Sequence, residues 1–165
     1  MRHTAMLSMA AVALLAACAP KAGAPAAAAA VDTAAVKLGI DSVRIKYSAL
    51  QIAGDAAGVA ALHDENAALD IYGMPRTMGR ANIEVALKGL YAMRKYSVSD
   101  ILPGQTNVRT NDDGSETGTY HDMYEEKGAK THEWGRYVVG LAKGTDGVWR
   151  LSYLMAFPDS IKLEK

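Results

Sequence analysis

Residues 148–157 read VWRLSYLMAF, and alternate positions in this stretch carry large apolar side chains. These positions are Trp149, Leu151, Tyr153, Met155 and Phe157. A period of two is typical of a β-strand with one buried face. The stretch therefore predicts a strand that closes a sheet, with an uninterrupted apolar face toward the core.

Three more strand-like segments precede this one along the chain. They span residues 96–110, 116–125 and 131–143. Short turn sequences separate the segments, namely NDDG at 111–114, KG at 127–128 and GTDG at 144–147. Turns of this kind join neighbouring antiparallel strands. The second half of the chain is therefore predicted to be an antiparallel sheet.

The first half of the domain reads as helices around one short strand. Asp32 is a suitable N-cap for a first helix, and Gly54 is a suitable end. Apolar side chains recur in that helix every three or four residues, at Val36, Ile40, Val43, Tyr47 and Leu50. A second helix is expected from Asp55 to about His63, a strand over residues 66–72, and a third helix from about Gly79. Helices followed by strands favour an α+β fold, with three helices packed on one sheet.

The N-terminus has the layout of a secretory signal. A basic start is followed by an apolar run from Ala5 to Leu15 and then by Ala16, Ala17 and Cys18. Leu-Ala-Ala-Cys resembles the lipobox of bacterial lipoproteins, which implies cleavage after residue 17 and acylation of Cys18. Residues 18–31 then read as a lipidated Ala/Pro-rich tether, and residues 32–165 as the domain. We expect a membrane-anchored protein of the cell envelope, facing the periplasm from the outer membrane if the cell has one.

Composition excludes several classes of function. The formal net charge is +0, from 18 basic and 18 acidic residues, and the basic residues form no stripe that would indicate nucleic-acid binding. Cys18 is the only cysteine, so the sequence offers no disulfide. The sequence contains no zinc-type spacing, phosphate loop or dinucleotide fingerprint, so neither a metal nor a cofactor is implied.

An ordered set of short motifs resembles the NTF2-like superfamily, including its SnoaL-like, DUF4440 and SgcJ/EcaC types and the ketosteroid isomerases. The motifs are AGDAAGVAAL at 53–62, NAAL at 66–69, GMP at 73–75, GRANI at 79–83, GRY at 135–137 and GVWRL at 147–151. The resemblance implies a cone in which a curved, mainly antiparallel sheet wraps the first helix and leaves a pocket at its wide end. It also implies a homodimer formed through the convex face of the sheet.

The resemblance also suggests which residues form the site. The expected pocket lining is Tyr47, Leu69, Ile71, Leu87, Tyr137, Val139 and Tyr153. Tyr47 matches the tyrosine that donates to an oxyanion in ketosteroid isomerases, whereas the two acid/base positions of those enzymes fall at Ile71 and Val139. Neither side chain can transfer a proton, so isomerisation of that type is disfavoured.

Other residues could still supply a base. Only His63, Asp70 and Asp122 offer a proton acceptor. Successive residues of a strand point to opposite faces, so Asp70 should point away from a pocket that Ile71 lines. His121 and His132 could approach each other across a hairpin, although a chance surface arrangement is the simpler interpretation.

Three functions remain open at this point. The first is binding of a small apolar molecule in the cone pocket without catalysis, which we favour because of Ile71 and Val139. The second is an isomerase, cyclase or dehydratase built around Tyr47 with His63 or Asp70. The third is a dimeric interaction or scaffold protein with a vestigial pocket.

Overall fold

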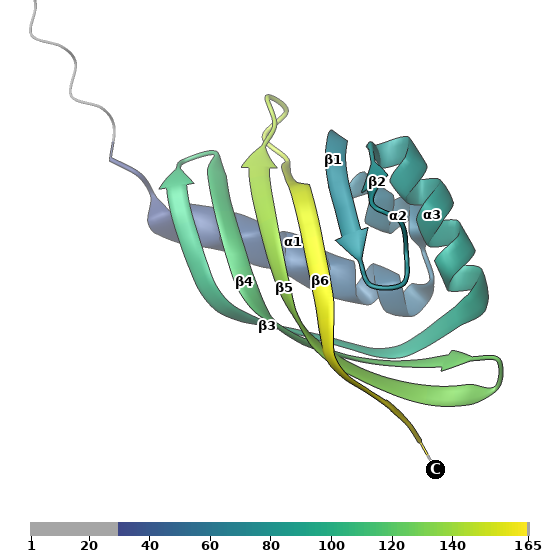
Figure 1. Ribbon diagram of the computed structural model, residues 1–165. Coiled ribbons are helices and arrows are strands. Elements are labelled where there is room, and N and C mark those ends of the chain that lie inside the picture. Colours follow the sequence, from purple (N-terminus) through teal and green to yellow (C-terminus); the bar gives the residue numbers. More distant parts are fainter. Residues whose placement is uncertain (1–29, 165) are drawn as a thin grey trace, which may run out of the picture. The chain divides into compact units, whose positions relative to one another are not determined.

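Three helices lie on one side of a curved six-stranded sheet (Figure 1). The computed structural model describes residues 30–164. Its elements are α1 (Thr33–Ala53), α2 (Ala56–Ala61), β1 (His63–Ile71), β2 (Thr77–Met78), α3 (Arg80–Met93), β3 (Arg94–Thr110), β4 (Asp113–Glu126), β5 (Ala129–Lys143) and β6 (Trp149–Leu163). The strand order is β2-β1-β6-β5-β4-β3, and all neighbours are antiparallel except β1 and β6. The expected α+β architecture is therefore confirmed.

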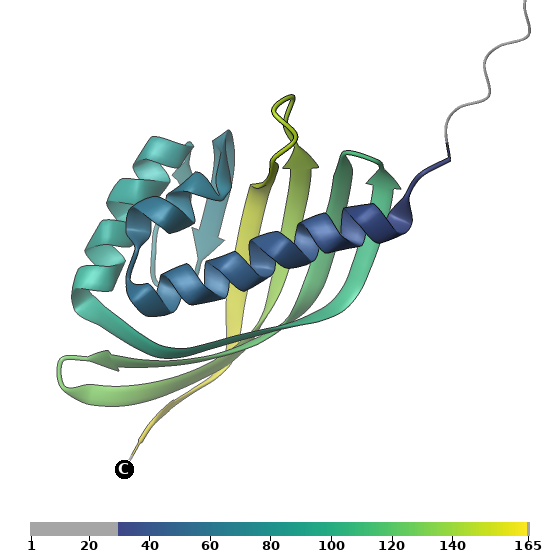
Figure 2. The ribbon, with the colours of Figure 1, turned by 180° about the vertical axis from the view of Figure 1, so that it is seen from behind.

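Helix α1 crosses the concave face of the sheet (Figure 2). The Asp32 carboxylate accepts a hydrogen bond from the Ala35 amide at 3.0 Å, and Gly54 ends the helix with φ of 68°. The buried side chains of α1 are Val36, Ile40, Val43, Tyr47 and Gln51. The predicted stripe is thus present, except that its last buried position is the polar Gln51 in place of Leu50.

Strands β4 and β5 carry an unusual inner face. Their register pairs Asp122 with Glu133 and Tyr120 with Gly135. The buried or half-buried inner positions include Glu116, Tyr120, Asp122, Glu133 and Tyr137. The concave side of the sheet therefore holds several ionisable side chains as well as apolar ones.

Strand β6 does not have the uninterrupted apolar face that its sequence predicts. Leu141 pairs with Leu151, but the preceding Gly140 pairs with Tyr153, so Ser152 is an extra residue in β6. A bulge of this kind exchanges the two faces of all later residues in the strand. Leu154 is consequently buried, whereas Phe157 is 45 % exposed on the convex side.

Strand β1 starts earlier than residue 66. Helix α2 ends at Ala61, and His63 already pairs with Leu151 of β6. His63 is fully buried as the first residue of β1, so the expectation that the second helix continues to it is wrong.

The predicted signal peptide and Cys18 lie outside the described residues. Within residues 30–164, no helix is long and apolar enough to span a membrane.

Candidate functional site

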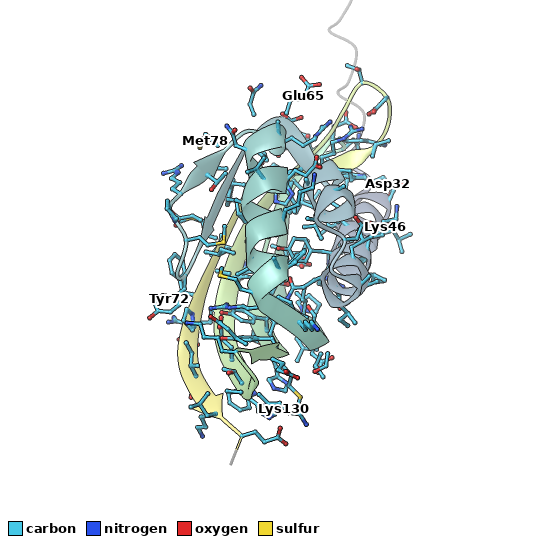
Figure 3. All side chains as sticks on the ribbon, turned by 90° about the vertical axis from the view of Figure 1, so that its right-hand side faces the viewer. Asp32, Lys46, Glu65, Tyr72, Met78 and Lys130 are labelled. Carbon is cyan, nitrogen blue, oxygen red and sulfur yellow. The ribbon has the colours of Figure 1, made fainter. Side chains whose placement is uncertain are left out.

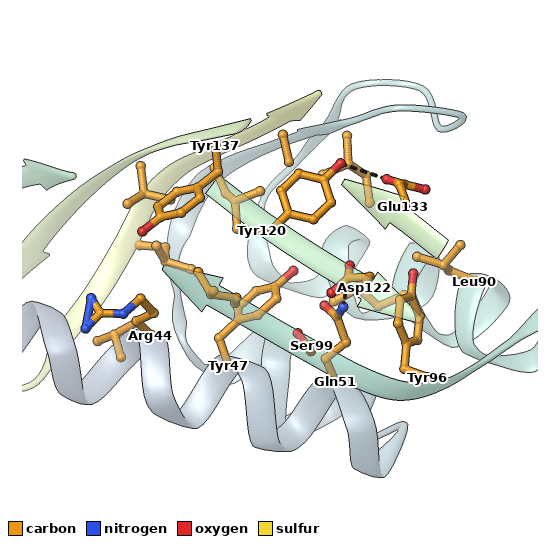
Figure 4. Close-up of a pocket in the computed structure, with 18 of the residues that line it drawn as sticks. Arg44, Tyr47, Gln51, Leu90, Tyr96, Ser99, Tyr120, Asp122, Glu133 and Tyr137 are labelled. Atoms are coloured by element: carbon orange, nitrogen blue, oxygen red, sulfur yellow. Dashed lines mark hydrogen bonds between the residues drawn. The ribbon is translucent and has the colours of Figure 1, made fainter. Parts of the chain in front are cut away.

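A cavity of about 100 Å³ lies between α1, α3 and the concave face of the sheet (Figure 4). Its apolar wall includes Ile40, Val43, Leu87, Leu90, Leu151 and Leu154. Its polar wall includes Arg44, Tyr47, Gln51, Glu116, Asp122 and Glu133. The cavity is thus largely apolar, with a few polar groups converging on it, as is typical of small-molecule sites.

Five of the seven predicted lining residues line this cavity: Tyr47, Ile71, Leu87, Tyr137 and Val139. Leu69 and Tyr153 do not. Leu69 lies two residues before Ile71 on the same face of β1 and is packed within the apolar core. The β6 bulge moves Tyr153 to the convex face, where its ring occupies the space beside Gly140.

The three predicted proton acceptors lie at different positions relative to the cavity. Asp70 is half-buried on β1 and lies outside the cavity lining, because its neighbours face inward and successive strand residues point to opposite sides. His63 is buried in the core beside the Tyr47 ring, with 6.4 Å between ring centroids, and does not line the cavity. Asp122, from β4, lines it.

Glu116 is a carboxylate whose charge is balanced. Arg44 donates to both of its oxygens at 3.1 Å, and the Tyr137 hydroxyl donates to Oε1 at 2.7 Å. Thr106 donates to Oε2 at 3.1 Å. Buried charges are tolerated when they are paired and hydrogen-bonded in this way, so Glu116 has a structural role at one end of the cavity.

Glu133 is satisfied by a second set of donors. The Tyr120 hydroxyl donates to Oε1 at 2.7 Å, and the Tyr124 hydroxyl donates to Oε2 at 3.2 Å. Arg94 lies 3.9 Å from Oε2, and its guanidinium also lies 4.4 Å from the centroid of the Tyr124 ring. Glu133 is therefore held by two hydroxyls and a nearby cation.

Asp122 differs from both glutamates. The Gln51 amide donates to Oδ2 at 2.9 Å, whereas the buried Oδ1 has no hydrogen-bond partner among residues 30–164. Burial raises the pKa of Asp122 to about 7, although Gln51 and the nearby Ser99 hydroxyl favour its ionised form and lower the pKa. The negative charge of Glu133 on the neighbouring strand adds to the effect of burial. A carboxyl with such a pKa can exchange a proton near neutral pH.

Three further buried polar atoms also have no hydrogen-bond partner within the described part of the chain, namely His63 Nε2, the Tyr91 hydroxyl and Ser99 Oγ. His63 lies outside the cavity lining, whereas Tyr91 and Ser99 line the same cavity as Asp122. We call the Tyr91 hydroxyl, Ser99 Oγ and Asp122 Oδ1 the three open polar atoms. Most buried polar atoms in native proteins have a partner, so such a group in one cavity is a feature that requires an explanation.

Neutral tyrosine hydroxyls surround Asp122. Burial raises the pKa of Tyr47, Tyr91 and Tyr96 far above the usual value, and the charge of Asp122 acts in the same direction on each. Figure 4 shows Asp122 between the Tyr47 and Tyr96 side chains. These phenols stay protonated, so they can donate hydrogen bonds to a bound group.

A groove of about 260 Å³ lies beside the cavity, between the β1–β2 loop and the end of α3. The groove and the cavity share Tyr72, Leu90 and Arg94. Tyr72 is 61 % exposed after β1 (Figure 3), and Arg94 is bonded to Glu126 at 2.9 Å.

The His121 and His132 side chains do meet, on the convex face. Nε2 of His121 lies 3.0 Å from Nδ1 of His132, and both rings stack on Trp134. Glu133 faces the opposite side of the sheet and does not join them. Residues 30–164 contain no group of three or more side chains arranged to hold a metal ion.

Sequence reasoning alone did not place Arg44, Gln51, Tyr96, Glu116 and Glu133 in the site. One signal in the sequence does point to part of it. Tyr120, Asp122 and Tyr124 alternate along β4, and this period of two places all three on the inner face. The partners on α1 lie some 70 residues away, as in the pair Gln51–Asp122 with a separation of 71, and only the fold brings them together.

Comparisons with known proteins show similarity in structure. No protein-family model and no curated protein matches the sequence. A ketosteroid isomerase-like protein from Erwinia carotovora atroseptica aligns with a TM-score of 0.69 and 14 % identity, over 74 % of this chain and 95 % of that one. A putative scytalone dehydratase from Novosphingobium aromaticivorans aligns with a TM-score of 0.68 and 14 % identity, over 81 % and 91 %.

A third similar solved structure is described as NTF2-like. It is an NTF2-like protein with a cystatin-like fold from Novosphingobium aromaticivorans, which aligns with a TM-score of 0.60 and 17 % identity, over 73 % of this chain and 79 % of that one. The chain described above has the NTF2-like fold.

Proposed function

We propose that this protein is a cell-envelope lipoprotein whose NTF2-like domain binds a compact, largely apolar small molecule in its cavity. The observation that carries the proposal is the presence of the three open polar atoms in one apolar cavity. Leaving a buried polar group without a partner costs about 1–3 kcal/mol, and a ligand with matching polar groups would remove that cost. Apolar walls with a few polar anchors are the usual composition of a ligand site.

A thermal-shift screen of single-ring alcohols, ketones and amines tests this proposal. A ligand that binds only the folded state stabilises it by about 2.7 kcal/mol at a hundredfold excess over its dissociation constant. Val139→Phe should fill the cavity and abolish the shift. Val138→Phe adds the same group to the convex face, where Val138 is 36 % exposed, and should leave the shift unchanged. If no compound stabilises the protein, the scaffold interpretation takes precedence.

A second candidate function is proton-transfer catalysis with Asp122 as the base. The specific observation is the pKa of Asp122, raised to about 7, beside neutral tyrosine donors. An acid/base group beside an oxyanion donor is the requirement for isomerisation and dehydration. The names of two structural neighbours, ketosteroid isomerase-like and scytalone dehydratase, belong to the same chemistry.

Exchange of carbon-bound hydrogen tests this candidate without a known substrate. Incubating the protein with cyclohexanone in heavy water should incorporate deuterium next to the carbonyl, as followed by NMR. Asp122→Asn should abolish the incorporation, and Tyr47→Phe should slow it. Equal rates in wild type and Asp122→Asn would contradict the catalytic candidate and leave ligand binding intact.

The lipoprotein part of the proposal rests on the sequence at Cys18. Fractionation of cells that produce wild type or Cys18→Ser tests it. Wild type should be found with membranes and should carry label from radioactive palmitate, whereas Cys18→Ser should carry none. Equal amounts of soluble, processed protein in both would exclude lipid anchoring.

A further inference from the structure

The charges around the cavity are not balanced. Glu116 is paired with Arg44, and Glu133 lies 3.9 Å from Arg94, which is itself bonded to Glu126. No cation within residues 30–164 forms an ion pair with Asp122, and the two polar groups that favour its ionised form, the Gln51 amide and the Ser99 hydroxyl, are both neutral. Glu133 also acts on Asp122 more strongly than Arg94 does. An ionised Asp122 would therefore add an uncompensated negative charge to the cavity wall.

Aromatic rings from four elements line the same cavity as Asp122. They belong to Tyr47 on α1, Tyr91 on α3, Tyr96 on β3 and Tyr120 on β4, all of which line the cavity. The charge of Asp122 adds to burial in raising the pKa of each of the four hydroxyls. The faces of tyrosine rings attract cations, and Arg94 already uses the Tyr124 ring in this way at 4.4 Å.

We infer that the ligand of this cavity is a small organic cation, a protonated amine whose ammonium group pairs with Asp122 between the tyrosine rings. The inference rests on the proposed binding of a small molecule and adds the chemical class of that molecule. The ammonium hydrogens satisfy Asp122 Oδ1, and the hydrocarbon part contacts the apolar wall at Leu87, Val139 and Leu154. A neutral alcohol could also donate to Oδ1, but it would leave the buried charge without a counterion.

Size restricts the ligand further. The cavity has a volume of about 100 Å³, which is about two thirds of the roughly 150 Å³ apolar cavity that accommodates benzene. An amine carrying one six-membered ring is therefore an upper limit on the size of the ligand.

The binding should depend on pH through Asp122. The charged and polar groups that face Asp122 are Tyr47 and Gln51 from α1, Tyr91 from α3, Arg94, Tyr96 and Ser99 from β3, Tyr120 from β4 and Glu133 from β5. Only the ionised carboxylate can pair with an ammonium group, and an alkylamine stays protonated up to about pH 9. With a pKa of about 7, Asp122 is mostly neutral at pH 6 and mostly ionised at pH 8. The affinity for an amine should therefore rise about tenfold between these two pH values.

Calorimetric titration of the full chain in detergent tests the inference with three matched probes. Benzylamine, benzyl alcohol and benzoate have similar sizes and carry a positive, a neutral and a negative group. Each is titrated at pH 6 and pH 8 into wild type, Asp122→Asn and Asp70→Asn. Asp70→Asn is the matched control, because it removes a carboxylate from a position outside the cavity lining.

The expected result is that benzylamine binds wild type and Asp70→Asn at least tenfold more tightly than benzyl alcohol does at pH 8. Asp122→Asn should lose this preference while it stays folded, with a melting temperature at pH 8 that is no lower than that of wild type. Equal affinity for benzyl alcohol, preference for benzoate, or unchanged benzylamine binding by Asp122→Asn would overturn the amine inference and leave the proposed ligand cavity standing. Absence of binding by all three probes at millimolar concentration would contradict both.

Discussion

At the scale of single residues, Asp122 is a carboxyl whose ionised form is disfavoured in the folded protein. Its pKa rises from 3.8 to about 7 because of burial, whereas in the unfolded chain it returns to its ordinary value. Its contribution to stability is therefore fully present below about pH 4 and is lost as the pH rises through 7. Asp122→Asn removes this dependence, since an amide carries no charge at any of these pH values.

We accordingly predict that Asp122→Asn becomes more stable than wild type as the pH is raised from 4 to 8. The gain should be at most about 4 kcal/mol, because one pKa unit corresponds to 1.36 kcal/mol. Urea denaturation of both proteins across this range measures it. The same pH dependence in both proteins would show that Asp122 is ionised without penalty.

His63 should act in the opposite direction. Burial lowers its pKa from 6.5 to about 4, and its Nδ1 lies 3.0 Å from the Val59 carbonyl oxygen. The neutral ring is thus the folded form, so the contribution of His63 is present above about pH 6.5 and is lost as the pH falls toward 4. An NMR titration should show a His63 ring that stays neutral down to about pH 4, with Nδ1 carrying the proton. Protonation of this ring near pH 6.5 would disprove the prediction.

These two residues also show what sequence can and cannot predict about a site. Both are identified from the sequence as proton acceptors, because few other residues in the chain could serve. Their environments are not predictable, since they depend on Gln51 for Asp122 and on the exact end of α2 for His63. Residue type identifies the candidates, whereas tertiary contacts decide which one faces the cavity.

At the scale of elements, the starts of the three helices and the end of α1 are the best predicted features. Asp32, Gly54, Asp55 and Gly79 all occupy the cap positions that their residue types predict. Caps depend on local backbone groups, so sequence alone is sufficient to locate them. The β6 face is different, because Ser152 is accommodated by a bulge against Gly140 and Leu141 of β5. Nothing within VWRLSYLMAF itself requires an extra residue at that point, and the predicted position of Tyr153 fails for this reason.

Two glycines provide a matched test of this local control. Gly54 has φ of +68° and Gly89 lies inside α3, and a Cβ on either would meet no atom within 4 Å. A methyl group therefore has room at both positions, and the two glycines differ in their backbone conformation. Gly54→Ala should destabilise the protein by about 1–2 kcal/mol because alanine disfavours the left-handed region. Gly89→Ala should stabilise it by about 0.5–1 kcal/mol. Chemical denaturation measures both, and changes of the same sign would refute the argument.

At the scale of the whole domain, the two faces of the sheet divide the chemistry. The concave face holds the carboxyls and tyrosines of the cavity, and the convex face holds apolar side chains exposed by 36 % or more. These side chains are Leu102, Trp134, Val138 and Phe157. The alternation of β3, β4 and β5 explains this division, because successive residues of a strand point to opposite faces. A substitution on one face should therefore have little effect on the function of the other.

We expect the convex face to be the contact of a homodimer. A stable interface covers about 800 Å² of each partner and is centred on aromatic and aliphatic side chains, which Trp134 and Phe157 supply on neighbouring strands. Phe157→Glu would bury a charge at the centre of such an interface, so it should convert dimers to monomers. Val85→Glu is the control, since Val85 is 70 % exposed on α3 and lies on the helical side of the domain. Light scattering of the Cys18→Ser protein, which lacks the predicted acyl anchor, measures the mass at micromolar concentration. The parent protein and its Val85→Glu variant should have twice the mass of one chain, and the Phe157→Glu variant should have the mass of one chain. A monomeric parent protein would exclude a dimer through this face at that concentration.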